Sequence, residues 1–358
     1  MFRRVRWPRL GRQQTNNQYP GVTVDELRLL ARAMARHLTL ASAMVCGGLL
    51  LPPVATAGPF LTRNQNPLLA LYGLPSPLPA RLPAEGGGRT AGLVNWSNTA
   101  KLENSGDPTF TLDAEVVEVR FDVEYAISPK FALRGELPWR QVSGGSLDGF
   151  IDNWHQVFGL PNGSRNRLPK DQFLIEYTDS GTTLLRLDES TSGIGDIPVS
   201  VGYQLHASDS RSVAAWLTVK APTGDASDLT GSGAADIALS LAMQSQVSDS
   251  WELFGQINGT WLGKGDLLPA LQKNAVWSGL AGVTWNPWRG LDLTVQLEGN
   301  STVFDGGGTQ LSGDAVVLTF GGSYRTQGGW QFDLGISEDV QGGASPDIAF
   351  NFGVRRGF

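Results

Sequence analysis

The sequence contains little cysteine, little histidine and no concentrated basic charge. One Cys in 358 residues excludes a small domain stapled by disulfides. Three His leave few side chains for general-base catalysis or metal binding. The net charge is −6 with Lys and Arg scattered along the chain, so we expect no nucleic-acid partner. In contrast, 45 Gly and 11 Trp favour an all-β protein of short strands and turns.

The longest apolar stretch, residues 38–57, has the features of a secretory signal peptide. Basic residues precede it, and Ala55 and Ala57 fit the preference for small residues at the cleavage site. A transmembrane helix is the alternative, but Gly-Gly and Pro-Pro pairs interrupt a stretch that is barely long enough to span a bilayer. We therefore expect residues 1–57 to be a leader and the mature chain to begin at Gly58.

The leader also affects the expected start and charge of the protein. Met34 gives a signal peptide of more ordinary length than Met1, so either is a candidate start. Without residues 1–57 the chain has no Cys and a net charge of about −12. A secreted chain of this size without disulfides needs a large buried area or a membrane for its stability.

Apolar and polar residues alternate strictly over long stretches. Residues 117–125 place Val, Phe and Tyr on one face and charged side chains on the other, and residues 131–140 repeat the pattern after a tight turn at 128–130. A period of two indicates strands, and the short connection indicates a hairpin. Similar segments follow to the end of the chain.

Two folds accommodate such strands, namely a soluble β-sandwich and a transmembrane β-barrel. The connections near residues 127, 207, 247, 287 and 326 are short, and they alternate with long connections rich in Gly and Asp. This asymmetry puts both ends of the strand region on the short-turn side, as in outer-membrane barrels. We therefore predict a transmembrane antiparallel up-and-down β-barrel over residues 91–358, in the lipid bilayer of a Gram-negative outer membrane.

Counting the alternating segments gives 12 strands, or 14 if a hairpin at 172–178 and 182–188 joins the barrel. The last segment ends on its apolar face at Phe358, and we expect the outer-membrane barrel assembly machinery to bind this strand. Aromatic residues near segment ends suit two girdles at the membrane interfaces. These residues are Trp96, Trp139, Tyr203, Trp251, Trp261, Trp277, Trp285, Trp288 and Trp330.

Residues 58–90 contain too many Pro to form a spanning strand. One interpretation is a loose periplasmic segment. The other is a hatch folded into the lumen, with its apolar part contacting a ligand or packing on lumenal aromatics. In the second case Leu68, Leu71 and Tyr72 lie on the path of the ligand.

The longest loop, residues 144–171, has apolar residues at helical spacing. Ser146 can cap the start of this helix and Gly159 its end. We expect a short amphipathic helix over the barrel mouth, acting either as a structural lid or as an entry surface for apolar molecules. The residues that would contact such a ligand are Phe150, Ile151, Trp154, His155 and Phe158.

Charged residues on two adjacent predicted strands face the lumen, where opposite charges can pair across the strands. A structural ion-pair network is one interpretation, and a selectivity or binding site is the other. The residues are Glu118, Arg120, Asp122, Glu124, Arg134, Glu136 and Arg140.

Catalysis has little support in the sequence. Outer-membrane lipases need a Ser or Thr nucleophile with a His, and only His155 and His206 follow the leader. Asp152 and His155 have a spacing that suits two metal ligands, but no third ligand accompanies them. We therefore expect no enzymatic activity, no metal site and no cofactor.

Several motifs resemble known families. Residues 62–67 (TRNQNP), 72–75 (YGLP), 147–151 (LDGFI), 158–163 (FGLPNG), 166–170 (NRLPK) and 192–197 (SGIGDI) resemble an uncharacterised proteobacterial family of unknown function. More loosely, residues 193–196 (GIGD), 220–225 (KAPTGD) and 232–236 (SGAAD) resemble outer-membrane barrels of the phenol meta-cleavage pathway, which are similar in turn to long-chain fatty acid transporters. That resemblance implies a barrel with an N-terminal hatch.

The sequence thus predicts an outer-membrane channel or passive transporter for small molecules, with small hydrophobic ligands as one candidate class. In this hypothesis the loop helix collects the ligand, the lumenal charges restrict passage and residues 58–90 gate it. The alternative is a non-transporting structural barrel with a closed lumen. A secreted soluble β-protein is a third hypothesis.

Overall fold

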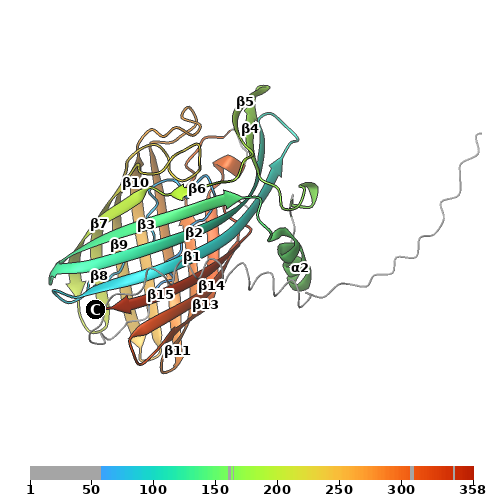
Figure 1. Cartoon of the computed structure of the whole chain (residues 1–358). Coiled ribbons are helices and arrows are strands. Elements are labelled where there is room, and N and C mark those ends of the chain that lie inside the picture. The colour runs from blue at the N-terminus through green and yellow to red at the C-terminus, as the bar shows by residue number, and fades with distance from the viewer. Residues whose placement is uncertain (1–57, 160–162, 164, 307–309, 342) are drawn as a thin grey trace, which may run out of the picture.

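A computed structural model describes residues 58–159, 163, 165–306, 310–341 and 343–358. The predicted signal peptide lies outside the described residues. The chain forms a closed antiparallel barrel in which each strand pairs with the next and β1 pairs with β15 (Figure 1). The 12 barrel strands are β1 (Gly88–Glu103), β2 (Thr109–Ser128), β3 (Phe131–Ser143), β7 (Ile197–Ala207), β8 (Arg211–Ala221), β9 (Asp236–Ser248), β10 (Trp251–Leu262), β11 (Ala275–Trp288), β12 (Leu291–Asn300), β13 (Ala315–Arg325), β14 (Trp330–Asp339) and β15 (Ile348–Gly357).

The predicted fold class and the count of 12 barrel strands are confirmed. The predicted hairpin forms as β4 (Leu174–Asp179) and β5 (Thr182–Leu187), but it does not enter the ring. β4 pairs with the start of β2, above the last residue of β3, and extends the wall outward. A short strand, β6 (Thr191–Ile194), pairs with β3 above the stretch that pairs with β7. The loops also contain the 3₁₀ turns η1 (Arg165–Arg167) and η2 (Gln310–Ser312).

The alternation of the strands separates a lipid-type surface from a polar lumen. On β10, Ile257 and Trp261 are 61% and 55% exposed on the outside, whereas Gln256 and Thr260 face inward and are buried. Outward aromatics lie near both ends of the wall. Trp251, for example, stacks on its β11 neighbour at the short-turn end, ten residues from Trp261. At about 3.4 Å per residue and a tilt of about 40°, these levels are about 25 Å apart, which matches the apolar band of an outer-membrane barrel.

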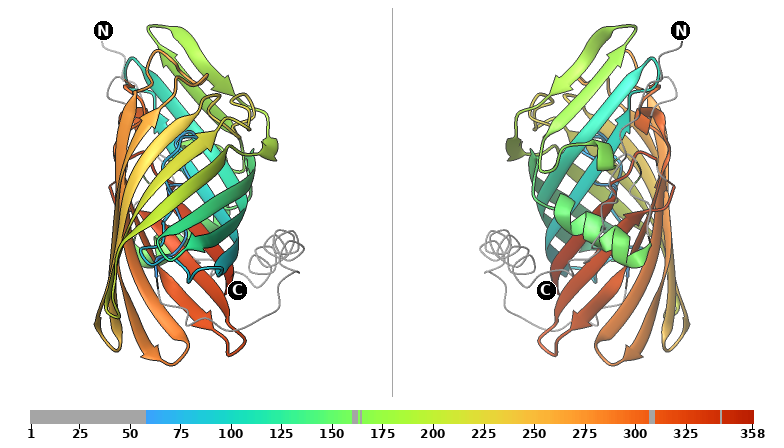
Figure 2. Two further views of the ribbon diagram at one scale, coloured as in Figure 1. Left: turned by 90° about the vertical axis from the view of Figure 1, so that its left-hand side faces the viewer. Right: turned by 90° about the vertical axis from the view of Figure 1, so that its right-hand side faces the viewer.

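The loop helix forms as predicted, as α2 (Asp148–Phe158), but its predicted position over the barrel mouth is wrong. It lies against the outer wall, across β1, β2 and β15 (Figure 2). Leu147 and Ile151 are fully buried there, in a cluster with Val94, Trp96, Val117, Val119, Ile348 and Phe350. The outward faces of these strands are apolar, so they bury the apolar stripe of the helix. Among the described residues, no helix is long and apolar enough to cross a membrane.

Two smaller predictions near α2, the girdle role of Trp96 and the helix cap at Ser146, are not met in the structure. Trp96 is only 3% exposed because α2 covers it, so it is not a girdle residue. Gly159 ends the helix in a left-handed conformation, as expected, but Ser146 does not cap its start. The carboxylate of Glu115 on β2 accepts hydrogen bonds from the backbone N–H groups of Ser146 and Leu147 instead. A charged acceptor on the wall thus satisfies donors at the start of the helix.

Residues 58–87, which we call the lumenal segment, run inside the barrel (the blue trace in Figure 2). The segment climbs from the short-turn end along the ascending arm (residues 59–64) and turns at its tip (residues 66–74) under the long loops. It then returns along the descending arm (residues 75–83) and continues into β1.

Candidate functional site in the barrel lumen

The ascending arm is held to the wall mainly through hydrogen bonds, and its one aromatic side chain, Phe60, is buried near Gly335 of β14. Backbone carbonyls accept from wall guanidinium groups, and side chains pair with wall carboxylates and amides. The pairs are Pro59 with Arg355, Leu61 with Arg120, Thr62 with Glu298, Arg63 with Glu118, and Asn64 with Asn300. Water can replace hydrogen bonds of this kind when a segment leaves its place.

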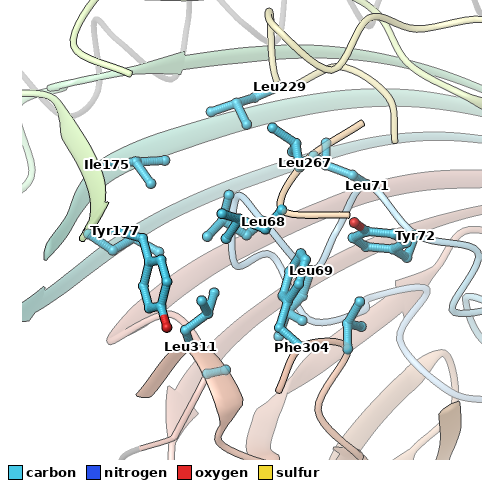
Figure 3. Packing of buried hydrophobic residues seen from close by; sticks show 14 of the residues in the cluster. Leu68, Leu69, Leu71, Tyr72, Ile175, Tyr177, Leu229, Leu267, Phe304 and Leu311 are labelled. Atoms are coloured by element: carbon cyan, nitrogen blue, oxygen red, sulfur yellow. The ribbon is translucent and has the colours of Figure 1, made fainter. Parts of the chain in front are cut away.

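The tip is different because it is apolar. It packs beneath the long loops in a cluster that includes Leu68, Leu69, Leu71 and Tyr72 (Figure 3). The Tyr72 ring meets the Phe304 ring edge-on, with 5.6 Å between centroids. These tip side chains are at most 1% exposed, so the cluster closes the long-loop end of the lumen. Other members of the cluster are Phe110, Leu112, Ile175, Tyr177, Leu229, Leu267 and Leu311.

The hydroxyl of Tyr72 lies in this apolar surrounding. Burial raises the pKa of Tyr72, and the nearby carboxylates of Asp236 and Asp266 raise it further. The hydroxyl therefore stays protonated at physiological pH. The three tip residues predicted from the sequence, Leu68, Leu71 and Tyr72, all lie in this apolar cluster.

The descending arm is clamped to one side of the wall. The Trp216 indole donates to the carbonyl of Pro79, and the side-chain oxygens of Gln204 and Gln256 accept from Leu82 and Leu78. Apolar residues of this arm pack on Trp216 and on alanines of β2, β3, β8 and β9. The cluster contains Leu78, Ala80, Leu82, Ala126, Ala132, Ala214, Trp216 and Ala242.

The predicted lumenal charges form an ion-pair network across β2 and β3. Three carboxylates (Glu118, Asp122, Glu136) alternate with three guanidinium groups (Arg120, Arg134, Arg140), which we call the wall network. Its closest contacts are Arg140–Glu118 at 2.7 Å, Arg134–Asp122 at 2.8 Å and Arg120–Asp122 at 2.9 Å. Glu124 lies below this network and pairs with Arg89 at 3.2 Å.

A second cluster joins the Gly- and Asp-rich motifs to the lumenal segment. The ammonium of Lys220 binds the carboxylate of Asp196 and the hydroxyl of Ser232, and it lies 3.3 Å from Asp236. Asp236 in turn accepts a 2.8 Å hydrogen bond from the backbone N–H of Gly73. The motif residues thus hold the tip of the segment to the wall, a role that sequence reasoning did not assign.

A cavity of about 340 Å³ lies below the ascending arm, at the short-turn end of the lumen. Leu78 and Leu82 of the descending arm line it on one side, and Phe254 lines it from β10. Arg89, Arg134 and Arg355 supply polar groups at its edge. This volume suits a small molecule.

The predicted ligand-contact residues do not form one site. The residues of α2 lie on the outer wall, where Phe150 packs on Phe350 and the Trp154 indole donates to Glu338 at 2.9 Å. Ile151 and His155 are buried, whereas Phe158 is 60% exposed. The tip and the wall network lie inside the lumen, on the other side of the wall from α2.

Arg63 and Glu298 are among the lumenal residues that sequence reasoning did not assign to a site. Arg63 belongs to the motif at residues 62–67, and Glu298 is a polar residue in one of the later alternating segments. Their pairing with Glu118 and Thr62 depends on the course of the lumenal segment, which strand periodicity does not encode. In the part of the chain that the structure describes, no cluster of three or more His, Cys, Asp or Glu side chains is arranged to hold a metal ion.

Comparisons with known proteins agree with the predicted resemblance. A family model described as "Protein of unknown function (DUF3187)" matches residues 39–358. Among solved structures, the chain is similar to the COG4313 outer membrane channel from Pseudomonas putida F1, at 15% identity and a TM-score of 0.55, over 79% of this chain and 99% of that one. This likeness confirms the outer-membrane type of barrel fold.

Weaker likenesses include two further barrels. The NanC porin matches at 10% identity and a TM-score of 0.43, over 75% of this chain and 98% of that one. The toluene transporter TbuX of Ralstonia pickettii matches at 10% identity and a TM-score of 0.39, over 77% of this chain and 90% of that one. No curated protein matches the sequence.

Proposed function

We propose that this chain, which belongs to the DUF3187 family of proteins of unknown function, is an outer-membrane channel or passive transporter for small molecules. The lumenal segment closes it at rest and is displaced when a solute passes. The observation that carries the proposal is the course of this segment through the lumen, where the side chains of Thr62, Arg63 and Asn64 are held by hydrogen bonds that water can replace.

The apolar cluster at the tip supports small hydrophobic or amphiphilic solutes. A solute with an apolar body can replace contacts of Leu68, Leu71 and Tyr72 without exposing them to water. The ascending arm then moves, the wall network restricts the passage, and the cavity of about 340 Å³ receives the solute on the short-turn side. We place α2 outside this path because its apolar stripe is packed on the outer wall.

The second candidate function is a structural barrel that transports nothing. Its support is the wall network, since Glu118 and Arg120 are at most 1% exposed and their charges are paired. A network of this kind stiffens a barrel without any need for a solute. The two candidates differ in whether the lumenal segment leaves its place.

The test is conductance in a planar bilayer, with the full chain compared with a variant that lacks residues 58–87. Heat-modifiable migration on a gel proves that both barrels are folded. The channel proposal predicts rare steps for the full chain and large, lasting steps for the deletion variant. Silence from both folded proteins would instead support the structural barrel.

A further inference from the structure

Arg63 is a cationic residue of the lumenal segment whose side chain contacts the wall network. Its guanidinium donates to the Oε2 atom of Glu118 at 2.9 Å, and its side chain is only 10% exposed. The same carboxylate oxygen accepts from Arg140 at 2.7 Å. Arg63 therefore shares an acceptor that the wall already satisfies.

The wall network is balanced in charge without Arg63. It contains three carboxylates and three guanidinium groups, and each carboxylate lies within 4 Å of at least one guanidinium group of the wall. The remaining contacts are Arg120–Glu118 at 3.6 Å, Arg120–Glu136 at 3.5 Å and Arg134–Glu136 at 3.3 Å. Withdrawal of Arg63 thus leaves no wall carboxylate of this network unpaired, so the cost of an isolated buried charge does not oppose it.

Glu298 faces the ascending arm from β12 and adds one more carboxyl group to the lumen. Its carboxylate accepts hydrogen bonds from the Thr62 hydroxyl at 2.9 Å and from the Gln296 amide at 2.7 Å. It has no ion-pair partner among the described residues. When the ascending arm leaves, Thr62 leaves with it, and one carboxylate without a fixed counter-ion remains in the space that opens.

That space already has some room. A void of about 30 Å³ lies between the ascending arm and the wall, lined by Thr62, Arg63, Glu298 and Asn300 among others. Removal of the arm joins this void to the larger cavity, which begins at Pro59 and Leu61. We call the space between Glu118 and Glu298 the arm slot.

We infer that the arm slot takes a small organic cation, and that Arg63 occupies it at rest as a built-in competitor. This inference rests on the proposed channel function and names its substrate class. The solute needs a cationic group with N–H donors, such as an amidinium or a guanidinium, to replace Arg63 and Thr62 at the two carboxylates. It also needs a small apolar body, because it passes the apolar tip cluster first.

Three probes of one shape separate charge from size. Benzamidine is cationic, benzamide is neutral and benzoate is anionic, while all three carry the same ring. The protein is the full chain with the three polar side chains of the ascending arm truncated (Thr62→Ala, Arg63→Ala, Asn64→Ala), alone or combined with Glu298→Gln. Matched controls are Arg186→Ala and Glu176→Gln in the otherwise unchanged chain, which break an exposed ion pair on the β4–β5 hairpin.

The measurement is single-channel current in a KCl gradient, before and after each probe is added. The triple variant is expected to open several-fold more often than the unchanged chain and to prefer K⁺ over Cl⁻. Benzamidine should block it at concentrations where benzamide and benzoate do not. Glu298→Gln should remove most of the cation preference and of the benzamidine block, and the hairpin controls should behave like the unchanged chain.

Two results would overturn the inference and leave the channel proposal standing. The first is a conducting triple variant without cation preference, or one that benzamidine and benzamide block equally. The second is a silent, folded triple variant when the variant lacking residues 58–87 conducts. Silence from both variants would overturn the channel proposal itself, and the arm slot with it.

Discussion

The backbone N–H of Gly73 donates a 2.8 Å hydrogen bond to the carboxylate of Asp236, across 163 residues of sequence. Gly73 lies at the tip of the lumenal segment, and Asp236 is the first residue of β9. Lys220 and the backbone N–H of Gly263 contact the same carboxylate. The contacts around Asp236 therefore position the tip. Substitutions at Gly73 or Asp236 are expected to alter how the tip closes the lumen.

Gly73→Ala tests this contact directly. A Cβ atom at position 73 would lie 2.7 Å from the Cβ atom of Asp236, too close for two carbon atoms. Overpacking of this kind costs about 1–3 kcal/mol. We expect a lower unfolding temperature and more frequent conductance steps than in the unchanged chain. Gly149→Ala is the control, since nothing lies within 4 Å of its Cβ position. It should neither lower the unfolding temperature nor make the conductance steps more frequent.

Lys220→Met tests the cation that joins Asp196 and Asp236. The substitution leaves Asp196 and Asp236 buried without their cation, and breaking a buried pair in this way costs about 3–5 kcal/mol. We expect the β8–β9 connection to become sensitive to a protease added outside, and the barrel to unfold at a lower temperature. Arg186→Ala removes a cation from an exposed pair and should cost less than about 1 kcal/mol. Equal effects of the two substitutions would contradict the assignment.

The strand pattern predicted the barrel well because alternation has a direct physical cause. Successive side chains of a strand point in turn to the polar lumen and to the outer surface, as Gln256 and Ile257 show. The position of α2 was not predictable in this way. An amphipathic helix specifies that one face is covered, but both the mouth and the outer wall offer apolar surface. Only the fold reveals that Ile151 packs beside Trp96.

The lumenal site was predictable only in part. The charges on β2 and β3 follow from strand register, so their pairing was expected and is observed. Arg63 and Gly73 belong to a segment without regular secondary structure, and no periodicity places them against Glu118 and Asp236. The Gly- and Asp-rich motifs contain a signal for this cluster, because Asp196 and Asp236 accept hydrogen bonds from backbone N–H groups of the neighbouring loops.

Ile151→Ala tests the position of α2. Ile151 is fully buried against the outer wall, and its truncation should cost about 2–5 kcal/mol of local stability. We expect faster proteolysis of the β3–β4 connection with no change in conductance, since the helix lies outside the lumen. Val157→Ala is the control because Val157 is 70% exposed. A conductance change that accompanies faster proteolysis in Ile151→Ala would contradict the placement.

Asp347 gives a pH dependence to the loop between β14 and β15. Its carboxylate pairs with Lys101 at 2.9 Å and with Arg165 at 2.6 Å. Burial raises the pKa of Asp347, but the two cations outweigh burial and hold this pKa below its usual range. The stabilisation is therefore full above the usual Asp pKa of about 4 and is lost as the pH falls through the lower, folded value.

A nitroxide label at Gln341→Cys, an exposed position in that loop, reports the change by electron paramagnetic resonance. We expect an immobile spectrum at pH 7 that sharpens once the pH falls below about 4. With Asp347→Asn added, the spectrum should be mobile and independent of pH. A label that stays immobile in both proteins down to pH 2 would refute the role of this carboxylate.

The most direct test of the account is whether the ascending arm must move for solutes to pass. Asn64 and Asn300 are joined by a 3.1 Å side-chain hydrogen bond, and the chain has no Cys after residue 46, so Cys at both positions can be linked by a short cleavable bis-maleimide. Conductance of the full chain is recorded before cleavage of the linker and after it. The account predicts silence while the link is intact and steps once it is cut, whereas equal conductance in both states would contradict it.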